Sequence, residues 1–170
     1  MTKEQVDYLL ALSKRVEKNG ILEDTITFDQ QVPFQQRYKL KSPIDDSYTF
    51  LYDIDQSAKN HLKLTLHLMD NDTKIGLLRV DFNGQHQNPE KNTENLPEEL
   101  YPLAGKFFGY NESHIHFYVE GYKPLAWAKS LENNFPVQNI TSPADVIKAF
   151  NSFNTMITLE TRFIINPILL

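Results

Sequence analysis

The sequence contains no cysteine among its 170 residues. This absence excludes disulfide bonds, thiol nucleophiles, zinc–thiolate sites and iron–sulfur clusters, and it fits a reducing cytoplasm. No apolar run approaches the roughly eighteen residues that predict a membrane-spanning helix, and the first residues lack the apolar core of a signal peptide. We therefore expect a cytoplasmic protein that does not partner with a membrane.

Glycine-rich phosphate loops and the H-E-x-x-H, G-x-S-x-G and kinase motifs are also absent, which disfavours enzymes of those types. The net charge of −5 and the isoelectric point near 5.5 argue against bulk attraction to nucleic acid. They leave room for a local basic groove or for an acidic surface that binds a basic partner. Apolar content of 41% and aromatic content of 12% are typical of a packed globular chain.

Periodicity and length predict an α+β fold in a single domain spanning residues 1–170. Thr2 and Gln5 can form a capping box for a helix over residues 3–18, and Ser142-Pro143 opens a second helix over residues 143–154. Between about 34 and 131 the chain alternates apolar and polar residues, with short turns, as antiparallel strands do. We expect a mainly antiparallel sheet of about five to seven strands, with both helices packed on one face.

Residues 84–113 interrupt this pattern with three prolines and many Asn and Glu residues. So long a segment without strands is unusual inside a compact domain. We predict a long insertion, with a short helix near residues 98–107. Its function would be that of a lid or binding loop; the alternative is a tolerated surface insertion.

Two strands are the main candidates for a functional site. Alternation within residues 114–120 turns Ile115 and Phe117 toward the core, and alternation within residues 78–83 does the same for Val80. If the two strands are neighbours, one face gathers a set of titratable side chains from both: Arg79, Asp81, His86, His114, His116, Tyr118 and Glu120.

Such a set could serve three chemistries. Metal-free cleavage of RNA needs a base, an acid and a phosphate-binding cation, which paired histidines and Arg79 can supply. A metal site could use His114 and His116, with His86 or a carboxylate as the third ligand. The third possibility is ligand or partner binding without chemistry.

The simplest alternative is a solvent-facing strand, because an antiparallel sheet with one wet face shows a polar residue at every second position. His61 and His67 illustrate this on another predicted strand, where no chemical partner is evident. Trp127 is more typical of a core or edge residue than of a base-stacking surface.

The segments "LLRVDFNGQHQNP" and "HIHFYVEGYKPLAWAKSL" resemble a family of small, uncharacterised bacterial proteins with an R-x-D…G…H-x-N-P segment followed by H-x-H-x-Y-x-E-G-Y…W-A. The resemblance covers about residues 34–131. Here the segment between Pro89 and His114 is longer, and the Gly84-to-His86 spacing is one residue shorter. The resemblance implies that the two motifs form a site, and it implies no particular reaction.

We therefore expect a toxin-like, metal-independent ribonuclease or related phosphodiester-cleaving enzyme, with no cofactor. His114, His116 and His86 would share the acid–base work, and Arg79 would bind phosphate with the help of Tyr118. Asp81 and Glu120 would orient these groups. The alternative is a non-enzymatic antitoxin, inhibitor or regulator from a mobile element, acting through a protein partner. No metal is expected; the alternative ligand set is His86, His114 and His116. The oligomeric state stays open.

Overall fold

The computed structural model describes residues 1–30, 34–90, 96–131 and 135–167. In chain order, the helices and strands of these residues are α1 Lys3–Ala11, β1 Arg15–Lys18, β2 Ile21–Glu23, β3 Thr25–Gln30, β4 Phe34–Lys41, β5 Thr49–Gln56, β6 Leu64–Asp70, β7 Gly76–Phe82, β8 His86–Gln87, the 3-10 helix η1 Glu98–Leu103, β9 Phe107–Phe108, β10 His114–Phe117, β11 Trp127–Ser130, α2 Pro143–Met156 and β12 Arg162–Pro167. None of the helices in these ranges is long and apolar enough to cross a lipid bilayer.

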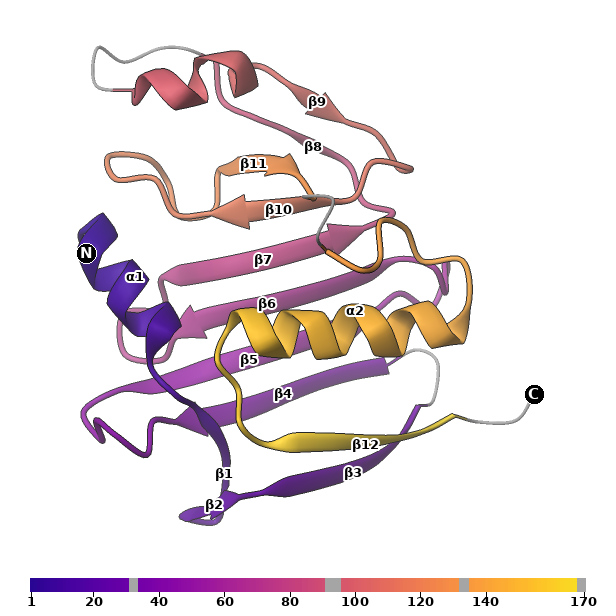
Figure 1. The fold of residues 1–170 in the computed structure, drawn as a ribbon. Coiled ribbons are helices and arrows are strands. Elements are labelled where there is room, and N and C mark those ends of the chain that lie inside the picture. Colours follow the sequence, from indigo (N-terminus) through magenta and orange to yellow (C-terminus); the bar gives the residue numbers. More distant parts are fainter. Residues whose placement is uncertain (31–33, 91–95, 132–134, 168–170) are drawn as a thin grey trace.

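The main sheet has eight strands in the order β11-β10-β7-β6-β5-β4-β1-β2 (Figure 1). Each neighbouring pair in it is antiparallel. Two smaller sheets are β12 with β3, which is parallel, and β8 with β9, which is antiparallel. The predicted α+β class with a mainly antiparallel sheet is confirmed, but the sheet is larger than the predicted five to seven strands.

The N-terminal helix is shorter than the predicted range of residues 3–18. The capping box of Thr2 and Gln5 is present, but α1 ends at Ala11 because the backbone of Leu12 turns to ψ 133°. Residues 15–18 then form β1, where Val16 lies opposite Leu40 of β4. Leu12 and Val16 are both buried, and a spacing of four residues fits a helical stripe and an alternating strand equally well. This strand and β2 supply the additional members of the sheet.

Both helices lie in front of the main sheet in Figure 1. The stretch Pro143–Met156 begins at the proline that the sequence marks as a helix start, and Ser142 caps it. On the sheet, the ring of Tyr52 stacks on Phe150 and Phe153 at centroid distances of 5.9 and 5.6 Å. This apolar face forms the core, so the polar positions of the same strands face the other way.

One lysine lies inside this core, where α1 and α2 end. The side chain of Lys14 is fully buried. Its Nζ donates hydrogen bonds to the backbone oxygens of Leu10, Leu12 and Ile157 at 3.1, 2.7 and 2.9 Å, and it lies 4.8 Å from the ring centroid of Phe50. An ammonium group has three donors, so each can bind one of these three carbonyl oxygens.

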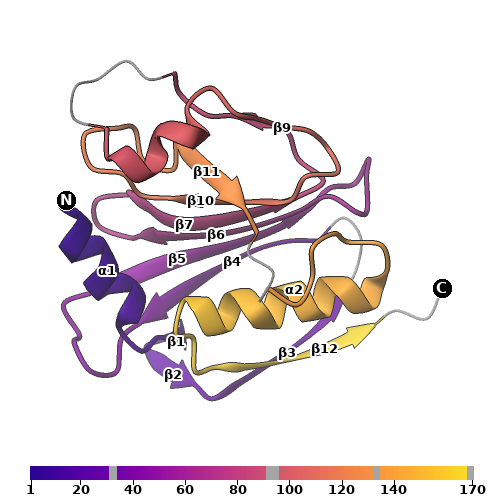
Figure 2. The ribbon, with the colours of Figure 1, turned by 45° about the horizontal axis from the view of Figure 1, so that its top comes forward.

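The predicted insertion over residues 84–113 contains β8, η1 and β9 and lies at the β11 edge of the main sheet (Figures 1 and 2). Leu96 and Leu100 pack there with Val119 and the fully buried Trp127 in a second, smaller apolar cluster. The segment is therefore a packed part of the fold in its described residues, and Trp127 is a core residue.

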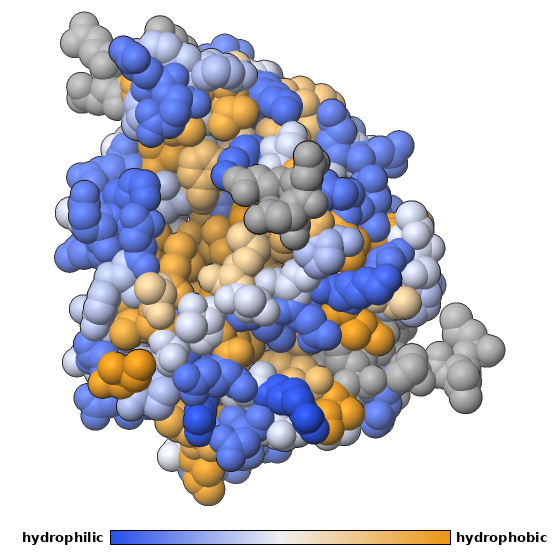
Figure 3. All heavy atoms as spheres, in the orientation of Figure 1, coloured by the Kyte–Doolittle hydropathy of each residue, from blue (hydrophilic) through white to orange (hydrophobic). Residues whose placement is uncertain are grey.

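A cavity of about 820 Å³ opens between this layer and α2. Figure 3 shows the hollow on the face that carries the helices, with apolar side chains in it. Leu78, Ile115 and Phe117 of the sheet line it, together with Leu100 and Met156. Because these sheet residues alternate with Arg79, His114 and His116, the cavity and the candidate site lie on opposite faces of the same strands.

Candidate functional site

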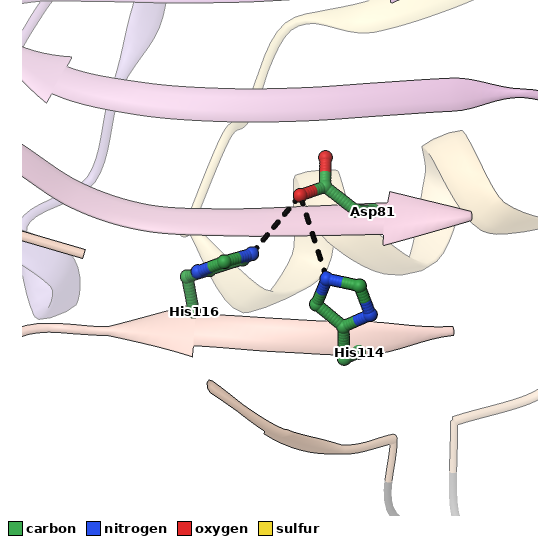
Figure 4. Close-up of side chains that lie close together, drawn as sticks. All are labelled: Asp81, His114 and His116. Carbon is green, nitrogen blue, oxygen red and sulfur yellow. Dashed lines mark hydrogen bonds and ion pairs between the residues drawn. The ribbon is translucent and has the colours of Figure 1, made fainter. Parts of the chain in front are cut away.

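The two predicted strands, β7 and β10, are direct neighbours. In their antiparallel register, Asp81 lies opposite His114 and Arg79 lies opposite His116. The shared polar face predicted from alternation is therefore present for these four residues. Figure 4 shows the side chains of Asp81, His114 and His116 close together, with dashed lines from Asp81 to both imidazoles.

Asp81 is the centre of this cluster. Its Oδ2 accepts hydrogen bonds from Nε and Nη2 of Arg79 at 2.9 and 2.6 Å and lies 3.0 Å from Nε2 of His116. Its Oδ1 accepts a hydrogen bond from the hydroxyl of Thr65 at 2.7 Å. Burial alone would raise the pKa of Asp81, but the hydrogen bond from His116, the charge of Arg79 and the Thr65 hydroxyl together hold this pKa well below its usual range.

Backbone carbonyls fix the tautomers of the two histidines of β10. Nδ1 of His114 lies 2.8 Å from the oxygen of Glu112, and Nδ1 of His116 lies 2.9 Å from the oxygen of Leu125. A carbonyl oxygen only accepts, so each Nδ1 carries a proton. In the neutral form of either ring, the lone pair is then on Nε2, the nitrogen that faces Asp81.

The two Nε2 atoms differ in their partners. Nε2 of His116 lies 3.0 Å from Oδ2 of Asp81, to which it donates when it carries a proton, and 2.9 Å from Nη2 of Arg79, from which it accepts when it does not. Nε2 of His114 is buried and has no hydrogen-bond partner among the described residues; its distance to Oδ2 of Asp81 is 3.7 Å. Burial lowers the pKa of His114, which favours a neutral ring with a free lone pair.

His86 comes from β8 and completes a group of three imidazoles. Its ring centroid lies 4.4 Å from that of His116 and 5.7 Å from that of His114. Nε2 of His86 lies 3.0 Å from both Oδ1 of Asn88 and the oxygen of Ala126, so it donates. The lone pair of the neutral ring is therefore on Nδ1. Burial also lowers the pKa of His86.

Two elements cover the histidines of β10. Phe108 of β9 is fully buried, and its ring centroid lies 4.7 Å from that of His114. The turn before β11 supplies Leu125, whose carbonyl binds His116 and whose side chain packs on Gly76. A Cβ at Gly76 would lie only 2.5 Å from Cδ1 of Leu125, so any larger residue there would require the Leu125 side chain to shift.

The cover makes the site a buried cluster with a partly open rim. His114 and His116 have no exposed surface, whereas the side chain of Arg79 is 33% exposed and that of Asp81 is 10% exposed. His86 is half-buried. A ligand that approaches the polar face would therefore meet Arg79 and His86 before the two histidines of β10.

Tyr118 and Glu120 do not join the site. The strand β10 ends at Phe117, so the alternation expected through residue 120 stops before them. The hydroxyl of Tyr118 donates to the backbone oxygen of Met1, and a carboxylate oxygen of Glu120 accepts from the backbone N–H of Lys3 at 3.1 Å. Both side chains thus contact the start of α1, and their expected roles in phosphate binding and orientation lack a structural basis.

Three residues near the cluster were not predicted as parts of it. Thr65 holds Asp81, and its place opposite Asp81 follows from the register of β6 and β7, a pairing that alternation could have suggested. Asn88 belongs to the first motif and binds the backbone of Ala128 through both atoms of its amide, which ties β8 to β11. No sequence signal distinguished Phe108 from its neighbour Phe107.

The polar face continues beyond the cluster as a row across five strands. Successive cross-strand partners from β4 to β10 are Arg37, Asp53, His67, Arg79 and His116. In this row Arg37 forms a two-pronged ion pair with Asp53 at 2.5 and 2.8 Å. Charged and imidazole groups therefore extend from the covered cluster toward an exposed ion pair at the other end.

Three side chains of the cluster around Asp81 could hold a metal ion. Oδ2 of Asp81 and a ring nitrogen of each of His114 and His116 lie within 4.8 Å of one another. This set differs from the expected alternative of three histidines, because Asp81 takes the place of His86 in it.

These features define an α+β protein whose eight-stranded sheet carries a buried Asp–Arg–His cluster on one face. Over residues 1–158 the chain matches the family described as "Family of unknown function (DUF6978)", and it belongs to that family. The predicted resemblance to a family without an assigned function is thereby confirmed. No curated protein and no solved structure matches the chain.

Proposed function

We propose that this protein is an enzyme that cleaves phosphodiester bonds, with RNA as its substrate. The observation that supports this proposal is the convergence of one guanidinium and three imidazoles, from β7, β8 and β10, around Asp81. Cleavage of RNA through its 2′-hydroxyl needs a base, a cation for the phosphate and a group that stabilises the leaving oxygen. The cluster holds side chains of each kind.

His86 is the base in this proposal. Its Nδ1 carries the lone pair, and the half-buried ring lies at the accessible rim. It takes the proton of the 2′-hydroxyl, and the 2′ oxygen then attacks phosphorus. Arg79, whose guanidinium is partly exposed, exchanges its contact with Asp81 for the phosphate oxygens.

His114 serves the leaving oxygen. When the bond between phosphorus and the 5′ oxygen breaks, that oxygen takes a proton from Nε2 of His114, and a 2′,3′-cyclic phosphate remains. This step needs the protonated His114 ring; burial lowers the pKa of that ring, and the negative charge of Asp81, 3.7 Å away, raises it and so opposes the effect of burial. His116 has both nitrogens engaged, so it is a positioning residue for Asp81 and Arg79.

The experiment uses an RNA oligonucleotide and a DNA oligonucleotide of the same sequence, each with EDTA and, separately, with Zn²⁺ or Mn²⁺. We expect the protein to cleave RNA but not DNA and to leave cyclic phosphate ends. His86→Ala and Arg79→Gln should lower the rate by about 10²- to 10⁴-fold, whereas His61→Ala, at an exposed position outside the cluster, should not. The two rim residues are preferred to His114 and His116, whose removal from the interior could unfold the chain.

Lack of RNA cleavage under all of these conditions would refute the proposal. Cleavage that is unchanged in both His86→Ala and Arg79→Gln would do the same, because it would come from another site or from a contaminant. Circular dichroism of each variant distinguishes lost chemistry from lost structure.

A second candidate function is non-enzymatic binding of a protein partner, as an antitoxin, inhibitor or regulator. Two observations favour it: His114 and His116 are fully buried, and the polar row continues to the exposed Arg37–Asp53 pair. A single stoichiometric partner that is lost on Arg37→Ala, together with no turnover of RNA, would support this function over the enzyme.

A further inference from the structure

We propose that Asp81, His114 and His116 bind a divalent ion of the first transition series, of the kind represented by Zn²⁺. The inference goes beyond the cleavage reaction, because these three ligands can hold an ion whether or not the protein is an enzyme. It is based on the placement of one carboxylate oxygen and two ring nitrogens within 4.8 Å of one another, on two adjacent strands.

The two imidazoles are oriented as metal ligands are. Each donates its Nδ1 proton to a backbone carbonyl, that of Glu112 for His114 and that of Leu125 for His116. Such hydrogen bonds fix the tautomer and ring orientation of metal-binding histidines. They leave the Nε2 atom of each ring facing Oδ2 of Asp81, at 3.7 Å for His114 and 3.0 Å for His116 (Figure 4), so an ion bound there would take the place of any proton on Nε2. Thr65 holds the other carboxylate oxygen, so Oδ2 is the one that faces the ion.

The second observation is the nitrogen that lacks a partner. His114 has no exposed surface, and within the described part of the chain its Nε2 makes no hydrogen bond. Buried polar atoms are nearly always satisfied, and an unsatisfied one calls for an explanation such as an ion. A metal ion between His114 and Asp81 would use this lone pair directly.

Arg79 competes with the ion. Its Nη2 lies 2.6 Å from Oδ2 of Asp81 and 2.9 Å from Nε2 of His116, so a cationic group already stands beside two of the three ligands. The side chain is 33% exposed and can turn toward solvent when an ion enters. The exchange would free the guanidinium for other contacts.

The ligand types restrict the ion. Imidazole nitrogen suits zinc, iron, nickel and copper, whereas Mg²⁺ and Ca²⁺ prefer sites made of oxygen ligands alone. Three protein ligands also leave positions for water or substrate, as in catalytic zinc sites. We therefore expect binding of Zn²⁺ and no comparable binding of Mg²⁺.

The test is calorimetric titration of the untagged, EDTA-stripped protein with Zn²⁺ and, as a comparison, with Mg²⁺. We expect one Zn²⁺ per chain. Asp81→Asn and His114→Gln should each weaken binding by at least about tenfold. His67→Gln is the matched control, because His67 is a histidine of the same face outside the ligand set, and its affinity should equal that of the wild type.

Arg79→Gln provides a variant whose expected effect is a gain. Removal of the competing guanidinium should tighten Zn²⁺ binding, a result that partial unfolding cannot imitate. Absence of stoichiometric Zn²⁺ binding in both the wild type and Arg79→Gln would overturn the inference. So would equal affinities in the wild type, Asp81→Asn and His114→Gln. RNA cleavage plays no part in these readouts, so failure of the metal site and failure of the proposed activity are told apart.

Discussion

The strands β6 and β10 both place histidine between apolar residues, but His67 of β6 and the two histidines of β10 have different surroundings. His67 of β6 is half-buried, and its Nε2 has no hydrogen-bond partner among the described residues. His116 lies two strands away in the same cross-strand row and contacts Asp81, Arg79 and the carbonyl of Leu125. Alternation determines which face a side chain occupies, whereas the covering segments determine what it can do there.

The cover is the first feature to test. Phe108→Ala should lower the free energy of unfolding by about 3–5 kcal/mol, because it removes a fully buried ring that packs on His114. Urea denaturation followed by circular dichroism measures this change. The matched control is Phe107→Ala, next to it on β9 and 54% exposed, which should change the free energy by no more than about 0.5 kcal/mol. Equal changes in the free energy of unfolding for the two variants would mean that the ring of Phe108 does not pack over His114 as described.

The ion pairs at the two ends of the polar row offer a second comparison. Asp81→Asn should destabilise the protein by about 2–3 kcal/mol, less than for a fully buried pair because Arg79 is partly exposed. Asp53→Asn removes a similar two-pronged contact with an arginine that is 60% exposed, so it should cost less than about 1 kcal/mol. Denaturation curves of both variants in EDTA give the values, and a larger cost for Asp53→Asn would contradict the comparison.

The pH dependence of the Asp81 effect has a definite sign. The folded protein holds the pKa of Asp81 below its ordinary value of 3.8, so the unfolded chain binds the proton more readily. The stabilisation is then fully present above about pH 4–5 and is lost as the pH falls further. The difference in unfolding free energy between the wild type and Asp81→Asn, measured from pH 7 to pH 3, should shrink toward the acidic end. A difference that grows there would have the wrong sign.

The smallest effect is expected at His67. His67→Leu should change the free energy of unfolding by no more than about 0.5 kcal/mol, because no hydrogen bond of the described residues to its Nε2 is lost. Thermal unfolding monitored by circular dichroism is sufficient to measure it. A loss above about 1 kcal/mol would show that the histidines of β6 and β10 are more alike than their contacts indicate.

The sequence predicted the candidate site best on β7 and β10, where the alternation of side chains gives the face of each residue and the two strands pair directly. Alternation placed Arg79 and Asp81 on one face of β7 and His114 and His116 on one face of β10, and the pairing of these strands brings them together. The same reasoning failed for Tyr118, because periodicity does not show where a strand ends. It also failed for the predicted helix over residues 3–18, because apolar residues spaced four apart, such as Leu12 and Val16, fit both a helix and a strand.

The remaining parts of the site depend on contacts that periodicity does not report. The carbonyls of Glu112 and Leu125 that fix the tautomers lie outside the strands. Phe108 reaches His114 from β9, which pairs with β8. Such contacts depend on loop paths, and loop paths are set by tertiary packing rather than by local pattern.

The buried Lys14 has a consequence for the order of events during synthesis. Its ammonium group binds two carbonyls close by in sequence and one, that of Ile157, that is 143 residues away. A ribosome makes the early strands long before it makes that third acceptor, so water binds the remaining N–H of Lys14 until the end of α2 is available. Contacts between distant residues are slow to form, and closure around Lys14 would therefore mark a late step, completed only when the end of α2 has left the ribosome.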